Sequence, residues 1–471
     1  MGISKKWIKR IVLPLIFLTL FLLLILNYDF ISVAFAKNFN QIWNWLGTTE
    51  YRFLDYPQKQ NLTYQDLTEV VGTIDFIGQD FINVPARGKA VLADLQKMTI
   101  TLYQDDQVIK SFTIVSIGKP GLPWETPRGQ FSILNKEENH RSSITQVWMP
   151  YSLQFLGNYF IHGWPYYDSG TLVSLGYSGG CIRLGTADAR EVFSFVDRGT
   201  VLIIGGNNLP NNSVGRYLAK DRNLFPAVTA ESYLVADLDN GAEIIRKNSR
   251  QLYPIASLTK LMTALVFLDQ VNPINQIVVG ADRQAIPYRD VGKLETGEVF
   301  IAKDLLWPLI LESSNKAAEV LATSLGDKRF VTEMNNRART IGLANLTFAD
   351  PAGIDSGNIS SAEDLFVLAK HIFFNKSYIF SVSRLAKFEL ANHVWQNVNP
   401  FVHNENFLGG KTGQTELAKQ TALNLFTVPF GEEKRRVAII VLRSTDRDGD
   451  TQKLLDYLGD NVSFIKDETQ P

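Results

Sequence analysis

The sequence has one cysteine among 471 residues, so the chain can form no disulfide bond within itself. Its formal net charge is −1 and no block of like charge is present, which excludes a general electrostatic attraction to nucleic acid. No long-period repeat and no low-complexity stretch is found. The cysteine and the five histidines form no paired-ligand pattern such as H-E-x-x-H, so we expect neither a metal nor an organic cofactor.

Length and composition are those of a globular protein with two or three domains, each able to bury a core. The N-terminal residues 1–36 are different, because four basic residues precede an uncharged apolar run, Ile11–Tyr28. This run is long enough for a membrane-spanning helix, and the basic flank is expected on the cytoplasmic side. A-F-A at Ala34–Ala36 is a cleavage-site pattern, so a removable signal is the alternative. Both interpretations place the rest of the chain outside the cytoplasm.

Changes in sequence pattern divide the remainder into four parts. Residues 37–87 form a lead-in segment without motifs. Residues 88–206 contain short alternating apolar runs separated by turn residues, which predicts a mostly-β domain. Residues 205–215, G-G-N-N-L-P-N-N-S-V-G, have the Gly, Asn and Pro composition of a linker, and residues 207–227 are interpreted as that linker. Residues 228–471 show strands, then helices, then strands, which predicts an α/β layered domain.

The lone thiol, Cys181, ends the run Y-S-G-G-C. A buried small hydrophobic residue is one interpretation of a free cysteine, and a nucleophile is the other. Export favours the nucleophile, since an unpaired cysteine in an oxidising compartment indicates a reactive thiol. His162, at the end of a strand-like run, is the candidate base, and Arg183 adds a nearby positive charge. Gly179 and Gly180 leave the backbone unobstructed, so their N–H groups and that of Cys181 can receive an oxyanion.

I-H-G followed by Y-S-G-G-C-I-R-L, with T-P-R-G upstream, resembles the L,D-transpeptidases of bacterial cell walls over residues 89–205. The resemblance implies that Cys181 is the acyl-accepting nucleophile and His162 its base. It implies that Gly163 and Ser178 shape the site and that Arg183 occupies the position after the cysteine loop. The family usually has a histidine where this chain has Gly179, so we expect activity with altered acceptor handling.

Three further motifs lie in the C-terminal part of the chain. Ser257 and Lys260 form S-x-x-K at the start of a predicted helix, where a spacing of three places both on one face. A lysine beside a serine can act as its base. Ser313 and Asn315 form S-x-N, and residues 411–413 form K-T-G before a predicted strand.

These motifs, in this order, resemble those of the penicillin-binding serine enzymes. The sequence around them, over about residues 228–445, resembles the D-alanyl-D-alanine carboxypeptidases. The resemblance implies Ser257 as nucleophile and Lys260 as general base. Proton relay and substrate binding then fall to Ser313, Asn315, Lys411, Thr412 and Gly413, and the N–H groups of Ser257 and Gln414 form the oxyanion hole. Lys316 stands where an acidic residue is common, and its simplest interpretation is a solvated helix face. A β-lactamase is less favoured, since no clear acidic deacylation motif lies between S-x-N and K-T-G.

The sequence therefore predicts a bifunctional enzyme that remodels peptidoglycan, tethered to the membrane with both catalytic domains on the extracytoplasmic (periplasmic) side of a bacterium. Its expected partners are peptidoglycan stem peptides, β-lactams as inhibitors and the membrane, with no nucleic acid. Two alternatives stay open: one domain is only a peptidoglycan-binding module, or the serine domain is an endopeptidase. Anchor cleavage, the diamino acid of the stem, the acceptor and the oligomeric state are also open.

Overall fold

The computed structural model describes residues 52–53, 85, 87–205, 215–221, 224–280, 293–343 and 345–466. The expected membrane anchor, the cleavage-site pattern and nearly all of the lead-in segment lie outside these ranges, apart from the two-residue strand β1 (Arg52–Phe53). Within the described ranges, no helix is both long and apolar enough to cross a membrane. The cysteine and serine motifs both belong to one compact unit, which spans residues 53–471.

Residues 87–205, called the cysteine domain below, fold around a nine-stranded sheet. Its strands are β2 (Lys89–Asp94), β3 (Thr99–Gln104), β4 (Gln107–Ser116), β5 (Gly129–Ser132), β6 (Asn135–Arg141), β7 (Trp148–Leu156), β8 (Tyr159–His162), β9 (Ile182–Leu184) and β10 (Val201–Gly205). They follow the order β5-β10-β2-β3-β4-β9-β8-β7-β6. Strand β10 pairs in parallel with β2, and β8 pairs in parallel with β9.

Side chains that alternate along these strands build the core of the cysteine domain. In β3, Ile100 and Leu102 are buried, whereas the intervening Thr101 is half-buried. The helix α5 (Thr186–Phe195) follows β9 and buries Ala189 and Val192 in the same core. The parallel pair β8–β9 carries His162 and places Cys181 one residue before its second strand.

Residues 215–466, called the serine domain, are built on an antiparallel sheet of five strands in the order β13-β12-β22-β21-β20. These strands are β12 (Ser232–Asp237), β13 (Glu243–Lys247), β20 (Phe407–Thr415), β21 (Lys419–Phe430) and β22 (Glu433–Ser444). Two-stranded sheets are formed by β14 (Tyr253–Pro254) with β17 (Ile359–Ser360) and by β18 (Lys387–Leu390) with β19 (His393–Gln396). Strands β15 (Gln276–Val278) and β16 (Glu298–Ile301) pair antiparallel in a three-stranded sheet that includes β1.

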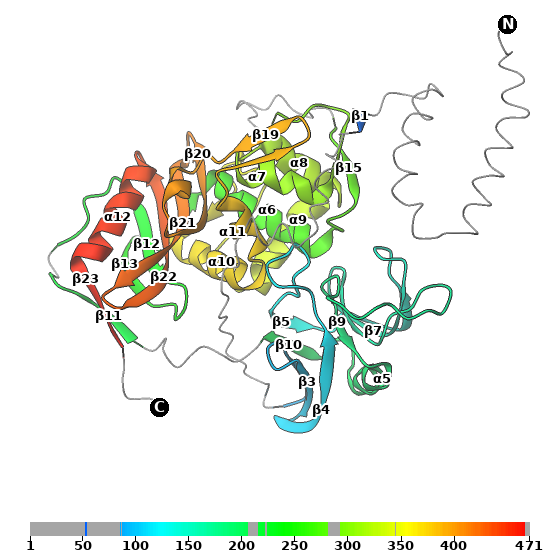
Figure 1. Ribbon diagram of the computed structural model, residues 1–471. Coiled ribbons are helices and arrows are strands. Elements are labelled where there is room, and N and C mark those ends of the chain that lie inside the picture. The colour runs from blue at the N-terminus through cyan, green and yellow to red at the C-terminus, as the bar shows by residue number, and fades with distance from the viewer. Residues whose placement is uncertain are drawn as a thin grey trace, which may run out of the picture. The chain divides into compact units, whose positions relative to one another are not determined.

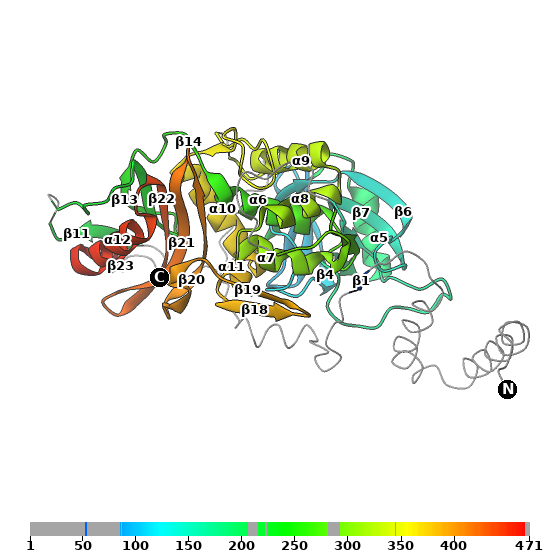
Figure 2. The same ribbon diagram turned by 90° about the horizontal axis from the view of Figure 1, so that it is seen from above.

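Helices of the serine domain lie on both sides of this sheet. They are η3 (Ala256–Leu258), α6 (Thr259–Gln270), η4 (Ala302–Leu305), α7 (Leu306–Ile310), α8 (Asn315–Thr323), α9 (Asp327–Thr340), α10 (Ala362–Asn375), α11 (Tyr378–Ser383), η5 (Pro400–His403) and α12 (Arg447–Asn461). Figures 1 and 2 show α12 on one side of the sheet and α6, α10 and α11 on the other.

The central strand β22 explains this three-layer arrangement. Val437, Ile439 and Val441 pack into the core beneath α12, and the intervening Ala438, Ile440 and Leu442 pack into the core shared with α6 and α10; all six are fully buried. Since successive side chains of a strand point to opposite faces, a strand apolar at every position must be covered on both faces.

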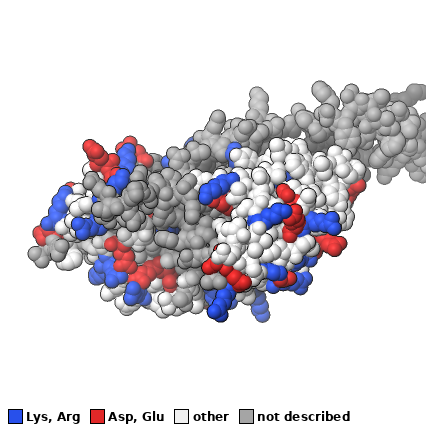
Figure 3. All heavy atoms as spheres, turned by 90° about the horizontal axis from the view of Figure 1, so that it is seen from below, with Lys and Arg blue, Asp and Glu red and all other residues white. Residues whose placement is uncertain are grey.

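Part of the segment interpreted as a linker belongs to the serine domain. Strand β11 (Gly215–Ala219) pairs antiparallel with β23 (Val462–Lys466), which follows α12 directly. The serine domain therefore begins by residue 215 among the described residues. On the face that Figure 3 displays, basic and acidic side chains are interspersed, in keeping with the near-zero net charge.

Candidate active sites

The parallel pair β8–β9 brings the cysteine motif residues onto one face of the sheet. Its register places Ile161 beside Ile182 and His162 beside Arg183. Because side chains alternate along a strand, Cys181 shares the face of Arg183 and hence that of His162. The opposite side chains, Ile161 and Ile182, are buried in the hydrophobic core and fix both strands.

The proton positions at this site follow from burial and hydrogen bonding. Burial raises the pKa of the Cys181 thiol to about 11, although the nearby Arg183 charge acts in the opposite direction. Burial also lowers the pKa of His162 to about 4, and Arg183 adds to this effect. The thiol and the imidazole are therefore both neutral at pH 7 rather than a thiolate–imidazolium pair.

One ring nitrogen of His162 forms a hydrogen bond with the backbone. His162 Nδ1 lies 2.6 Å from the carbonyl oxygen of Gly163, and a carbonyl only accepts, so Nδ1 carries the proton. The other nitrogen, Nε2, keeps its lone pair and can accept a proton, as a general base must. In this structure the Cys181 thiol faces the carbonyl oxygen of Asn158, with an Sγ···O distance of 3.8 Å.

The loop that precedes the thiol is held by a short series of hydrogen bonds. Ser178 Oγ donates to the carbonyl of Cys181 at 2.5 Å and accepts from the N–H of Gly180 at 3.1 Å. Thr126 Oγ1 donates to the carbonyl of Gly180 at 2.9 Å. We expected the N–H groups of Gly179, Gly180 and Cys181 to bind an oxyanion. In this structure the N–H of Gly180 already donates to Ser178 Oγ.

The two glycines of the loop differ in what surrounds them. Gly180 has a φ of +104°, and a Cβ there would lie 2.3 Å from the Tyr159 ring, so the position requires glycine. A Cβ on Gly179 would meet nothing within 4 Å. The position where the resembling family usually has histidine is therefore open to a side chain.

Gly163 and Arg183 support the loop that leads to the thiol. A Cβ on Gly163 would lie 3.1 Å from both Pro150 and Thr186, so this glycine allows close packing beside His162. Arg183 is buried; its Nη1 donates to the carbonyl of Ser174 at 3.3 Å, and its guanidinium lies 5.8 Å from the Trp164 ring centroid. Arg183 thus contacts the segment that leads to the thiol at two points, Trp164 and Ser174.

In the serine domain, Ser257 and Lys260 meet as the helical spacing predicted. Ser257 lies in η3, and Lys260 lies in the first turn of α6. Lys260 Nζ donates to Ser257 Oγ at 2.8 Å, to Asn315 Oδ1 at 2.8 Å and to the carbonyl of Ala352 at 2.6 Å. The lysine side chain is fully buried, so three fixed acceptors take the place of water around its amine.

The S-x-N and K-T-G motifs meet each other in the same way. Lys411 Nζ donates to Ser313 Oγ at 2.8 Å and to the carbonyl of Thr412 at 2.7 Å. Burial lowers the pKa of Lys411 well below its usual value, and the positive charges of Lys260 and Arg447 lower it further. Ser313 Oγ therefore lies against an amine whose charge is disfavoured by burial and by the charge of Lys260.

Two residues of this site have unusual backbone conformations. Ala256, directly before the serine, has a φ of +49°, and Ser313 has a φ of +64°. Non-glycine residues with positive φ concentrate at functional sites, where the surrounding structure enforces them. Gly413 of β20 contributes to this packing, since a Cβ there would lie 2.8 Å from the backbone nitrogen of Ser257.

Residues 219–445 match the family model of D-alanyl-D-alanine carboxypeptidase, and residues 88–204 match that of the L,D-transpeptidase catalytic domain. D-alanyl-D-alanine carboxypeptidase DacB2 of Mycobacterium tuberculosis is 31% identical over 234 residues, which are 48% of this chain and 78% of DacB2. The chain belongs to the D-alanyl-D-alanine carboxypeptidase family. The two resemblances noted in the sequence are thereby confirmed.

Another relative carries a different activity in its name. The D-alanyl-D-alanine endopeptidase of Pseudomonas aeruginosa is 30% identical over 197 residues, which are 40% of this chain and 64% of that protein. The chain thus spans less than two thirds of this relative's length.

Among solved structures, the D-alanyl-D-alanine carboxypeptidase of M. tuberculosis H37Rv has a TM-score of 0.46 at 25% identity, covering 51% of this chain and 94% of that one. Penicillin-binding protein D2 of Listeria monocytogenes, in its cefotaxime-bound form, has a TM-score of 0.45 at 24% identity, covering 50% of this chain and 99% of that one.

The carboxypeptidase-family residues named from the sequence share one cleft of the serine domain. It is lined by Ser257, Ser313, Asn315, Thr412, Gly413 and Gln414, with Glu312, Gly353, Ile354, Val398, Thr415, Glu416 and Arg447 completing the wall. Lys260 and Lys411 are buried behind this wall and reach it through their amines.

Arg447 is the site residue that the motifs did not reveal. It opens α12, lines the cleft, and its Nη1 donates to the carbonyl of Gly413 at 3.0 Å. A guanidinium in this position can bind a carboxylate. No short motif surrounds it, so only its place three residues after a strand offered a signal.

The expectation that Lys316 lies on a solvated helix face is wrong. Its side chain is buried, with 8% of its surface exposed, in the first turn of α8 and directly after Asn315. The basic residue at this position is therefore part of the packing around the S-x-N motif.

Proposed function

We propose that the protein is a peptidoglycan-remodelling enzyme with two acyl-transfer sites, a serine D,D-carboxypeptidase and a cysteine L,D-transpeptidase. The observation that carries the serine half is the fully buried Lys260 amine, held 2.8 Å from Ser257 Oγ by Asn315 and Ala352. A pure binding module has no use for a desolvated lysine against a serine hydroxyl.

The serine reaction uses this contact directly. The form of Lys260 that acts as base is the neutral amine, which donates to Asn315 Oδ1 and the Ala352 carbonyl and turns its lone pair toward Ser257 Oγ. Ser257 Oγ attacks the carbonyl carbon of the penultimate D-alanine, and its proton passes to this lone pair. The peptide C–N bond breaks, the leaving amine takes a proton through Ser313, and an acyl-Ser257 ester remains. Thr412 and Arg447 hold the carboxylate of the terminal residue until that residue leaves. Water then attacks the ester carbonyl, its proton passes through Lys260 to Ser257 Oγ, and the shortened peptide is released.

The cysteine reaction begins from two neutral groups. Cys181 Sγ attacks the carbonyl carbon of the third stem residue as its proton passes to His162 Nε2. The terminal D-alanine leaves with that proton, and a thioester remains. The amine of a second stem peptide attacks the thioester, loses a proton to His162, and releases the thiol with a new cross-link formed.

We propose that the two sites act in sequence. The serine site shortens a pentapeptide stem to a tetrapeptide, and the tetrapeptide is the donor that an L,D-transpeptidase uses. Both domains act on the extracytoplasmic side of the membrane, with residues 1–36 as the anchor.

Mass spectrometry of defined stem peptides incubated with the exported region tests this assignment. Wild-type protein should convert pentapeptide to tetrapeptide and to third-to-third cross-links. Ser257→Ala should do neither with pentapeptide, yet cross-link tetrapeptide normally. Cys181→Ala should trim pentapeptide and form no cross-links. Unimpaired cross-linking of pentapeptide by Ser257→Ala refutes the sequence of reactions, and full cross-linking by Cys181→Ala refutes the cysteine assignment.

The endopeptidase alternative has support in the name of the P. aeruginosa relative. The same experiment separates the two, because an endopeptidase releases monomers from purified cross-linked dimers. Cleavage of dimers by wild-type protein and not by Ser257→Ala would assign that activity to the serine site.

A further inference from the structure

A buried polar network joins the cysteine domain to the serine domain and is used by neither proposed reaction. Lys376, in the connection between α10 and α11, donates from Nζ to Tyr159 OH at 2.6 Å and to the carbonyl of Glu125 at 3.0 Å. Tyr159 OH donates to the carbonyl of Leu268 in α6 at 3.1 Å. Ser377 Oγ donates to the Glu125 carboxylate at 3.1 Å.

The charges of this network are deeply buried. Lys376, Asp269 and Glu125 expose 0%, 1% and 2% of their surfaces. Lys376 Nζ lies 3.6 Å from one Asp269 oxygen, and Arg337 Nε lies 2.9 Å from the other. Buried charges are tolerated when they are paired, and removing one partner leaves the others uncompensated. Both ion pairs lie within the serine domain, and Glu125 is the buried carboxyl group that the cysteine domain adds, held by Ser377 and next to Lys376.

The same residues of the cysteine domain touch the loop that carries the thiol. Tyr159 lies against Gly180, where a Cβ would come within 2.3 Å of its ring. Thr126, next to Glu125 in the chain, donates to the carbonyl of Gly180 at 2.9 Å. Two separate paths thus lead from Lys376 to the residue before Cys181, one through Tyr159 and one through residues 125–126.

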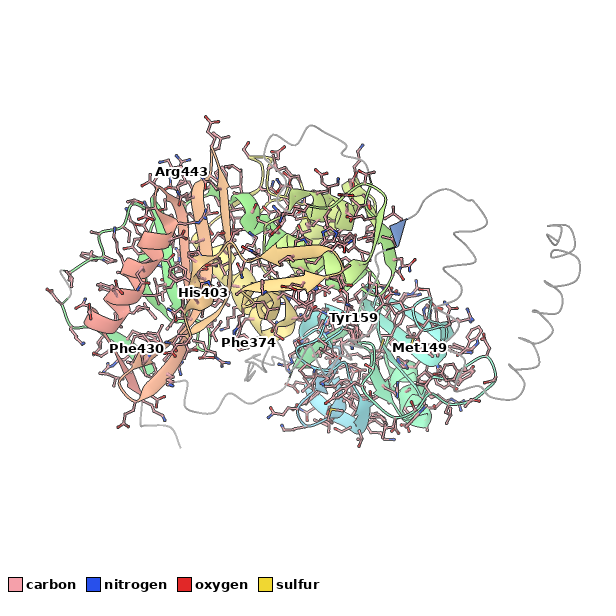
Figure 4. All side chains as sticks on the ribbon, turned by 45° about the horizontal axis from the view of Figure 1, so that its top comes forward. Met149, Tyr159, Phe374, His403, Phe430 and Arg443 are labelled. Carbon is pink, nitrogen blue, oxygen red and sulfur yellow. The ribbon has the colours of Figure 1, made fainter. Side chains whose placement is uncertain are left out.

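The geometry of Tyr159 makes it the better defined of the two paths. Tyr159 is the first residue of β8 and is 4% exposed. Lys376 Nζ lies 4.4 Å from the centroid of its ring. Figure 4 labels Tyr159 in the cysteine domain and Phe374 in the serine domain. Phe374 stands two residues before Lys376 in the chain. The hydroxyl group of Tyr159 is bonded only to serine-domain atoms in the contacts described above, while its ring supports the glycine of the thiol loop.

We propose that Lys376 of the serine domain is a positioning residue for the cysteine reaction, holding Tyr159 and residues 125–126 so that Gly180 and Cys181 keep their reactive geometry. The cysteine site is then complete only when the serine domain is docked against it. This inference rests on the proposed transpeptidase activity of Cys181. It explains why a lysine is buried at a domain contact far from Ser257 in the sequence.

The test uses the full exported region with single changes. Lys376→Met removes the ammonium group and keeps most of the apolar stem, and Tyr159→Phe removes only the hydroxyl group. Lys328→Met, at an exposed position of α9, is the matched control. Cross-linking of tetrapeptide gives kcat and KM for the cysteine site, and acylation by a fluorescent penicillin reports the serine site in the same molecules.

Lys376→Met and Tyr159→Phe should each lower the cross-linking kcat about tenfold, since small displacements of a catalytic group have effects of that order or larger. KM and the rate of penicillin acylation should stay within about twofold of wild type. The double variant should lose less than the product of the two single losses, because both changes break the same contact between Lys376 and Tyr159. The control should match wild type.

Wild-type kcat in folded Lys376→Met and Tyr159→Phe would overturn the positioning role. A parallel loss at both sites with a lowered Tm would show a purely structural contact and would also overturn it. If wild-type protein forms no cross-links at all, the proposed transpeptidase fails instead. The rate at which iodoacetamide modifies Cys181 then still tests whether Lys376 controls the thiol loop.

Discussion

Titration of the single thiol tests the mechanism of the cysteine site. Burial raises the pKa of Cys181 to about 11, so about one molecule in ten thousand carries a thiolate at pH 7. The rise from an ordinary value near 9 corresponds to a cost of about 3 kcal/mol for ionising the thiol in place. His162, with a pKa of about 4, is neutral above pH 5 and offers no imidazolium to offset that cost.

The assay is the rate of alkylation by iodoacetamide between pH 6 and pH 10, measured by intact mass. Cys181 is the only cysteine of the chain, so every adduct at sulfur reports this thiol, and Cys181→Ala is the blank. Because the thiolate is the reactive form, the rate should rise about tenfold for each pH unit over this range. His162→Gln should change it by less than about threefold.

Cross-linking should respond differently to the same substitution. If His162 accepts the proton during attack, His162→Gln should lower kcat by about 10² to 10⁴. Below pH 5 the wild-type rate should fall as His162 becomes protonated and loses its free lone pair. An alkylation rate that levels off by pH 8, and drops in His162→Gln, would show a thiolate–imidazolium pair and refute this account.

Three other predictions follow from single contacts. Gly180→Ala should lower the free energy of unfolding by more than about 1 kcal/mol, through its φ of +104° and the Tyr159 ring, whereas Gly179→Ala should have little effect, as chemical denaturation can show. Intact mass should show a penicillin adduct on Cys181→Ala and none on Ser257→Ala; the reverse pattern would exchange the two assignments. Arg447→Met should raise KM for pentapeptide severalfold and leave a neutral amide analogue unaffected, and equal effects on both substrates would exclude carboxylate binding.

Local patterns in the sequence were sufficient for several structural features. The spacing of three between Ser257 and Lys260 predicted their contact, because η3 continues directly into α6 and the contact is local in the chain. The alternating run after Lys89 contains β2, β3 and β4, and Asn240-Gly241 lies in the turn between β12 and β13. In each case the residues that form the feature are close neighbours in the chain.

Features that depend on distant residues were not predicted. Strand β11 was interpreted as linker, because its partner β23 lies at the other end of the serine domain. Lys316 was expected on a solvated face, and only the packing of α8 buries it. Arg447 reaches the cleft because α12 begins beside β20, which no local pattern reveals.

The sequence by itself determined which groups are available for chemistry: one thiol with a histidine upstream, and three motifs in the order of the penicillin-binding enzymes. Tertiary structure decided their protonation and their partners. The Lys260 amine meets Asn315, 55 residues away, and Ala352, 92 residues away, and Lys376 meets Glu125 across 251 residues. The physical reason is that pKa values and pairing depend on burial and on the groups brought within a few ångströms, and these are properties of the folded chain.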